Sequence, residues 1–257
     1  MSVLGTGAAT ADATTVPGLS NLSEELGLTD LLPQLPGLPS LPDLLGQNAD
    51  AIRCTTVIQI GDSTSVNVDN PTAVPSPQDT LTAQYKRVGA TTVDLDADGG
   101  RSIVERLGGA PNADQVVATH RSRGEQGCWV IAMGVNDAAN ISVGSSVDAD
   151  TRINRIMDQL SGQPVLWPTV TTANPSVRGY DTAAMASFNQ ALRRAIARYP
   201  NLAVYDWAAA AQPGWFTDGI HYNSTGNGER NRRFADALAT AFPPGVGALP
   251  ATRWIDG

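Results

Sequence analysis

Two alternating periods of hydrophobic residues organise the chain from Thr55 onwards. Short apolar or β-branched runs, of which Thr55–Ile60 (TTVIQI) is the first, predict buried strands. Longer stretches with apolar residues three and four positions apart predict amphipathic helices. We expect strands over Thr55–Ile60, Thr91–Leu95, Trp129–Met133, Pro164–Trp167 and Leu202–Tyr205. We expect a helix to start at Ser76–Asp79, and further helical segments over Arg101–Leu107, Ala113–Thr119, Asp148–Leu160, Asp181–Tyr199 and Gly228–Phe242.

This order of elements predicts an α/β fold. Strands that alternate with helices form a parallel sheet with helices on both faces. Because the crossovers are right-handed, the expected architecture is a three-layer α/β/α sandwich with a five-stranded parallel sheet and flavodoxin-like topology. In such sheets ligands bind beyond the carboxyl ends of the strands, so residues that follow the predicted strands share one rim.

The chain divides into three segments by composition. Residues 1–50 form an N-terminal extension in which Leu31–Pro42 repeats leucine and proline without the period of a helix or strand. This extension is either a linker that tethers the domain or a strap that packs on it. Residues 51–243 form the predicted domain, and residues 244–257 form a C-terminal tail. Ala11-Asp12-Ala13 matches the end of an export signal, or belongs to an ordinary terminus.

Composition and charge exclude several classes of function. The 257 residues, 42% of them hydrophobic, are enough for one sizeable core. A formal charge of −8 leaves no basic surface for nucleic acid. No apolar run reaches the roughly 18 residues that a transmembrane helix needs, so we expect no transmembrane segment. We also expect no cofactor and no bound metal.

Three short strings carry the chemistry: Gly61-Asp62-Ser63, Gly134-Val135-Asn136-Asp137 and Asp218-Gly219-Ile220-His221. A serine hydroxyl is a weak nucleophile and needs a neighbouring base. His221 is the better candidate, because the only other histidine, His120, lies in an Arg-rich stretch with no carboxylate at a suitable spacing before it. Asp218 is close enough in sequence to orient the His221 ring.

These strings resemble the motifs of the SGNH hydrolase family, also called GDSL-type esterases, and the resemblance covers Thr55 to Phe242. It implies Ser63 as the nucleophile, with Asp218 and His221 completing a catalytic triad. Asp98–Ser102 resembles the second family block, which makes Gly100 a backbone donor to the oxyanion. Asn136, in the third block, is then a side-chain donor, and the N–H of Ser63 completes the oxyanion hole.

The resemblance implies a serine esterase that removes an acyl group, such as acetyl, from a carbohydrate or lipid through an acyl-enzyme on Ser63. An acyltransferase that uses the same residues to acylate a sugar hydroxyl is the first alternative, because both reactions pass through one intermediate. A non-catalytic binding module of the cell envelope is an alternative of another class. The chain has no Gly-x-Ser-x-Gly string, which argues against an α/β-hydrolase.

The two cysteines occupy nearly equal depths on two predicted strands. Cys54 lies nine residues before Ser63, and Cys128 lies eight before Asn136. If these strands are neighbours, about 4.8 Å apart, the Cα atoms fall in the range of roughly 4.4 to 6.8 Å that a disulfide spans. The alternative is two buried free thiols. A disulfide implies an oxidising compartment, and so a secreted or cell-envelope protein.

Two further features have open interpretations. Arg101, Trp167, Trp215 and Phe216 lie near the predicted rim and either line a substrate pocket or pack beneath it. The stretch Asp94–Glu105 fits the pattern of a calcium-binding EF-hand loop, D-x-[DN]-x-[DN]-G-x₅-E. An EF-hand requires a helix before this loop, whereas the sequence predicts a strand, so an acidic surface loop is the preferred interpretation.

Overall fold

A computed structural model of the chain describes residues 51–245 and 249–257. The predicted N-terminal extension and its Ala-x-Ala string lie outside the described residues. None of the helices in the described part combines the length and the hydropathy needed to cross a membrane.

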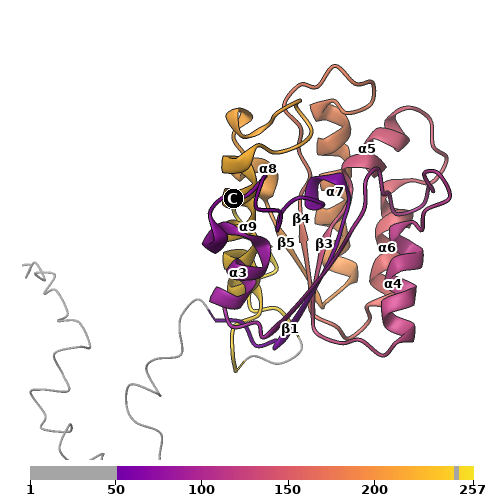
Figure 1. The fold of residues 1–257 in the computed structure, drawn as a ribbon. Helices are drawn as coiled ribbons and strands as arrows, with labels where there is room; N and C mark the ends of the chain where they lie inside the picture. The colour runs from indigo at the N-terminus through magenta and orange to yellow at the C-terminus, as the bar shows by residue number, and fades with distance from the viewer. Residues whose placement is uncertain (1–50, 246–248) are drawn as a thin grey trace, which may run out of the picture. The chain divides into compact units, whose positions relative to one another are not determined.

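One parallel sheet forms the centre of the described residues (Figure 1). Its strand order is β2-β1-β3-β4-β5-β6, which is the flavodoxin-like order with one strand added. The first five strands confirm the predicted ones to within two residues: β1 (Thr56–Gly61), β2 (Thr92–Ala97), β3 (Cys128–Ala132), β4 (Val165–Pro168) and β5 (Leu202–Tyr205).

The expectation of five strands is wrong, because a sixth strand lies in the segment predicted as a tail. β6 (Trp254–Ile255) pairs in parallel with β5. The N–H of Val204 donates to the Arg253 carbonyl at 2.8 Å, and that of Asp206 donates to the Ile255 carbonyl at the same distance. A strand of two residues is too short to produce a period in the sequence.

Helices cover both faces of the sheet (Figure 1). The apolar side chains of α3 (Leu81–Arg87) and α9 (Ser224–Ala241) pack on one face. The other face is covered by α4 (Ala113–Ser122), α5 (Val135–Ser142), α6 (Ala149–Gln159) and α7 (Thr182–Arg198). Successive residues of β1 alternate between the two cores: Ile58 and Ile60 pack on the second face and Val57 on the first. Burial on both faces explains the continuous apolar run of this strand.

The helix expected over Arg101–Leu107 is wrong, because this segment is an irregular loop. Its polar groups bond to distant parts of the chain. The Arg101 guanidinium donates to the Asp96 carbonyl at 2.7 Å, and the N–H of Ile103 donates to the Asp137 carboxylate at 2.9 Å. These contacts replace the local hydrogen bonds of a helix.

The other helix predictions hold, with differences at the ends. The helix expected from Ser76–Asp79 starts with a short 3₁₀ turn, η4 (Pro77–Asp79), and Thr80 caps α3 instead. Helix α5 and the short α8 (Trp207–Ala210) were not predicted. Both begin within three residues of the end of a strand.

Cys54 and Cys128 form a disulfide with Cα atoms 5.7 Å apart. The bridge confirms the predicted pairing of cysteines from adjacent strands. Their expected equal depth is wrong, because Val57 lies opposite Cys128 and Cys54 precedes β1 by two residues. The bridge lies at the amino end of both strands, opposite the end that carries Ser63.

Candidate active site

The nucleophile candidate Ser63 begins a 3₁₀ turn, η3 (Ser63–Ser65), directly after β1. Asp62 caps this turn, because its carboxylate accepts from the N–H of Thr64 at 2.9 Å and from the Thr64 hydroxyl at 2.7 Å. A Cβ at Gly61 would lie 2.4 Å from the Cβ of Ser65. The turn is therefore this tight only because position 61 has no side chain, and it raises Ser63 above the rim of the sheet.

Ser63, His221 and Asp218 form one series of hydrogen bonds. The Ser63 Oγ lies 2.9 Å from His221 Nε2, although 158 positions separate the two residues in the chain. His221 Nδ1 lies 2.7 Å from Asp218 Oδ2. This order of groups can pass a proton from the hydroxyl to the ring while the carboxylate holds the ring in place.

Backbone hydrogen bonds fix the Asp218 carboxylate. Its Oδ1 accepts from the N–H of Ile220 at 2.9 Å and of His221 at 2.7 Å. Burial alone would raise the pKa of Asp218. These hydrogen bonds and the His221 ring outweigh that effect and lower the pKa to about 2. The carboxylate is therefore ionised near neutral pH, which suits a group that orients and stabilises an imidazolium.

Gly219 joins this loop to the segment between β4 and α7. Its φ of +86° favours glycine. A Cβ there would lie 2.7 Å from the carbonyl oxygen of Ala173, whose own N–H donates to the Gly219 carbonyl at 2.7 Å. The loop with Asp218 and His221 is thus held against the neighbouring rim loop by backbone contact.

Asn136, the predicted side-chain donor, lies in the first turn of α5. Its Nδ2 donates to the Arg101 carbonyl at 2.7 Å, and its Oδ1 accepts from the Tyr180 hydroxyl at 2.7 Å. An amide nitrogen carries two hydrogens, so the first contact uses only one of them. Gly100, the predicted backbone donor, precedes Arg101 and has a φ of +67°, so its sharp turn also favours glycine.

Asp137, beside Asn136, makes buried contacts that support the fold. It is fully buried and accepts from Arg152 Nη1 at 2.7 Å. Burial raises its pKa to about 6, although the Ile103 N–H and the Arg152 guanidinium act in the opposite direction. This carboxylate connects α5, α6 and the loop that carries Gly100, and so supports the rim from below.

The four predicted pocket residues lie mostly within the protein. Arg101 Nη2 pairs with Asp96 Oδ1 at 2.8 Å beneath the loop. Trp167 is fully buried, with its indole N–H on the Met133 carbonyl at 2.9 Å. Trp215 is also buried and stacks on Trp207, with centroids 5.8 Å apart. Only Phe216, which packs on Tyr222, keeps a larger exposed surface.

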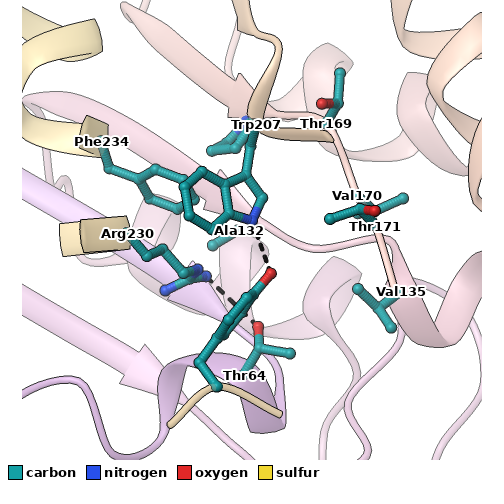
Figure 2. Close-up of a pocket in the computed structure, with 11 residues that line it drawn as sticks. Thr64, Ala132, Val135, Thr169, Val170, Thr171, Trp207, Arg230 and Phe234 are labelled. Atoms are coloured by element: carbon teal, nitrogen blue, oxygen red, sulfur yellow. Dashed lines mark hydrogen bonds between the residues drawn. The ribbon is translucent and has the colours of Figure 1, made fainter. Parts of the chain in front are cut away.

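A cavity of about 20 Å³ is lined by neighbours of the candidate catalytic residues, and Figure 2 draws the lining side chains. Thr64, Val135 and Tyr222, which line it, are the chain neighbours of Ser63, Asn136 and His221. Its other walls are Ala132, Pro168–Thr171, Trp207, Arg230 and Phe234. This volume accommodates a group of about the size of one water molecule or a methyl group.

Arg230 in the cavity wall was not predicted from the sequence. It is only 3% exposed, and its Nη2 donates to the Ser65 hydroxyl at 3.0 Å. Its guanidinium lies 4.4 Å from the centre of the Phe234 ring. Arg230 stands among several arginines of α9, and nothing in the sequence separates it from its exposed neighbours.

The Asp94–Glu105 stretch does not form an EF-hand, because Asp94 and Asp96 belong to β2 and Glu105 pairs with Arg152. Near it, Asp94, His120 and Glu125 hold ligand atoms within 4.8 Å of one another, the spacing of a potential metal site. His120 already contacts Glu125 through Nδ1 and Asp96 through Nε2, the latter at 3.1 Å. Both ring nitrogens thus have partners in the protein.

The comparisons with known proteins concern the fold. No family model and no curated protein matches the chain. A solved structure of a putative arylesterase from Agrobacterium tumefaciens is similar, with a TM-score of 0.54, 18% identity, and coverage of 70% of this chain and 96% of that one. The fold is shared. Also similar is the structure of a carbohydrate acetylesterase family member from Sinorhizobium meliloti, with a TM-score of 0.51, 17% identity, and coverage of 72% of this chain and 99% of that one. A third similar structure is a lipase/acylhydrolase from Enterococcus faecalis, with a TM-score of 0.54, 17% identity, and coverage of 75% of this chain and 99% of that one.

At these identities the comparisons show the fold alone, and they confirm the predicted α/β fold with a parallel sheet. They cover almost the full length of each similar protein. The roles of individual residues in this chain therefore rest on its own geometry.

Proposed function

We propose that this protein is a serine esterase of the SGNH type. The observation that carries the proposal is the hydrogen-bonded series from Ser63 through His221 to Asp218 at the carboxyl rim of the sheet. Three structures with the same fold are named as esterases or acylhydrolases, which supports the same class of reaction here.

In the proposed reaction the Ser63 Oγ attacks the carbonyl carbon of an ester while His221 Nε2 takes its proton. The resulting tetrahedral oxyanion collapses, the bond to the alcohol breaks, and the imidazolium gives the proton to the leaving oxygen. The acyl group then remains on Ser63. Water attacks this acyl-enzyme with His221 as base, the bond to Oγ breaks, and Ser63 regains its proton as the carboxylic acid leaves.

The backbone N–H groups of Ser63 and Gly100 and the side-chain Nδ2 of Asn136 are the proposed donors to the oxyanion. Such donors act because they are positioned before charge develops on the oxygen. Loss of one donor typically lowers kcat by about 10² to 10³.

The small cavity beside Thr64 supports a short acyl group, and acetyl is the proposed one. Its volume of about 20 Å³ is close to the size of a methyl group. We place the alcohol part, a carbohydrate or lipid, on the open side of the site. The side chains of His221 and Asp218 are 44% and 53% exposed there, so water reaches the base.

The disulfide supports an extracytoplasmic location, because such bridges persist in oxidising compartments.

A panel of 4-nitrophenyl esters from acetyl to palmitoyl tests the proposal. We expect the acetyl ester to give the highest kcat/KM, and Ser63→Ala to lower kcat by several orders of magnitude without a change in melting temperature, because it removes one hydroxyl. A fluorophosphonate should label the wild type and not the variant. An unlabelled, inactive wild type would support the alternative of a non-catalytic binding module.

A further inference from the structure

The loop between β4 and α7 contacts the proposed oxyanion donor through one side chain. The Tyr180 hydroxyl donates to Asn136 Oδ1 at 2.7 Å. On the other side of the same amide, Nδ2 donates to the Arg101 carbonyl at 2.7 Å. Asn136 is therefore held between a donor on its oxygen and an acceptor on its nitrogen.

The backbone around Tyr180 is firmly held on α5. A Cβ at Gly179, which has a φ of +91°, would lie 3.0 Å or less from Val143 Cγ1 and the Ala139 carbonyl oxygen. The Gly179 carbonyl accepts from the Ser142 hydroxyl at 3.2 Å, and the Tyr180 carbonyl accepts from the Thr172 hydroxyl at 2.6 Å. Close backbone contact with the end of α5 thus brings the phenol to the start of the same helix.

The phenol acts as a donor under all ordinary conditions. Burial raises the pKa of Tyr180, and the nearby carboxylates of Asp62 and Asp137 raise it further. The hydroxyl therefore keeps its proton. Its single proton is donated to Asn136 Oδ1, while the Arg101 carbonyl, which can only accept, keeps the Nδ2 end of the amide on the opposite side.

We propose that Tyr180 is a positioning residue that fixes the orientation of the Asn136 amide; this inference rests on the proposed function. An asparagine amide rotates over a broad, nearly two-fold range, and its two ends have opposite polarity. In one orientation Nδ2 donates to the oxyanion, whereas in the other a carbonyl oxygen repels it. The Arg101 carbonyl can only accept and so favours the first orientation. Donation by the phenol to Oδ1 holds that orientation from the other end and polarises the amide, which strengthens its N–H groups as donors.

A purely structural role for Tyr180 predicts that its substitution changes stability and not the properties of the Asn136 amide. The ring packs on the apolar core beside α5 and α7, so its removal would lower stability whatever the hydroxyl does. Tyr180→Phe keeps the ring and deletes only the donor. A matched control is Tyr199→Phe, because the Tyr199 hydroxyl bonds to Asp158 at 2.8 Å at the far end of α7.

The experiment measures kcat and KM for the acetyl ester in wild type, Tyr180→Phe, Asn136→Ala and the double variant. We expect Tyr180→Phe to lower kcat about tenfold and to change KM less than twofold, because the amide acts in the transition state. In the Asn136→Ala background the same change should have no further effect on kcat. Labelling by a fluorophosphonate should slow in parallel, while Tyr199→Phe behaves as wild type.

A kcat of Tyr180→Phe within twofold of wild type would overturn the inference, and so would an equal loss in the Asn136→Ala background. If melting temperature and kcat fall together in Tyr180→Phe and Tyr199→Phe alike, the tyrosines act through stability and the inference is again overturned. Failure of the proposed function looks different, because the wild type itself would then neither hydrolyse esters nor react with the fluorophosphonate.

Discussion

At the scale of single residues, the candidate site combines a hydroxyl, a ring and a carboxylate whose environments give them different tasks. Ser63 stands on a tight turn above the sheet, whereas Asp218 is anchored by two backbone N–H groups. The anchoring keeps Asp218 ionised, since its pKa lies at about 2. Its carboxylate therefore orients the His221 ring without taking a proton itself.

Replacement of Asp218 by asparagine tests this division of roles. We expect Asp218→Asn to lower kcat by about 10³ to 10⁴, because an amide can hold the His221 ring in the wrong tautomer. The low pKa also means that the carboxylate is lost only as pH falls towards about 2. In wild type, a loss of kcat at any pH well above that value must come from another group. A pH profile of kcat for both proteins checks this; an Asp218→Asn variant with near-normal activity would contradict it.

At the residue scale, the short strings of the sequence indicated which side chains to expect in one site. Asp218 and His221 are three positions apart, and the structure brings them into contact with Ser63. Tyr180 and Arg230 gave no such signal, because each contacts the site through the tertiary fold and stands in a stretch without a motif. Arg101 and Trp167 were expected near a pocket, yet their polar groups bond to the ends of strands.

At the scale of elements, the contact between α4 and the edge strand β2 depends on charge. His120, on α4, faces Asp94 and Asp96 on β2 and Glu125 beyond the helix, and its ring packs edge-on against Trp129. Burial lowers the pKa of His120, but hydrogen bonds to Glu125 and Asp96 raise it more, so the net shift is upward. The pKa of Asp96 is lowered, because the hydrogen bonds from His120 and Arg101 outweigh its burial.

These shifts predict how stability depends on pH. A histidine with a raised folded-state pKa stabilises fully below its unfolded value, about 6.5, and this contribution is lost as pH rises through the folded value. A carboxylate with a lowered pKa stabilises above about 3.9 and loses its contribution as pH falls. We expect the free energy of unfolding to decline from pH 6 to pH 9 in wild type, and to decline less in His120→Gln. Urea unfolding at several pH values measures this; parallel curves would contradict it.

Element prediction failed where tertiary contacts override local pattern. Arg101–Leu107 has helix-forming residues, but Ile103 donates to a carboxylate on α5 and Arg101 reaches β2. Helix α5 was not predicted, because it begins within the Gly134–Asp137 string, and such a string is typical of a turn. Strand β6 depends wholly on its partner β5.

At the scale of the whole molecule, the alternation of strands and helices was sufficient to predict the layers and the order of the first five strands of the central sheet. This success has a physical cause, since parallel strands require crossovers of one hand and cover on both faces. The adjacency of two strands likewise predicted that Cys54 and Cys128 would meet, although the register places Val57 and not Cys54 opposite Cys128.

The disulfide should contribute substantially to global stability, because it closes a long loop. Its cysteines are 74 positions apart. We expect a Cys54→Ser, Cys128→Ser variant to lose about 2 to 4 kcal/mol of unfolding free energy. Chemical denaturation of both proteins measures the loss, and unchanged midpoints would contradict the expectation. At temperatures where the variant stays folded, its kcat should equal that of wild type.

We expect an unchanged kcat because the bridge lies at the amino end of β1. The covalent link lies just before this strand and the nucleophile just after it, and the six residues of the strand alone span roughly 20 Å at about 3.3 Å per residue. Reduction of the sulfur bond would therefore leave the proton relay untouched and act only on the survival of the fold. For the proposed esterase, the redox state of the surroundings therefore determines how long the folded protein persists and does not change kcat.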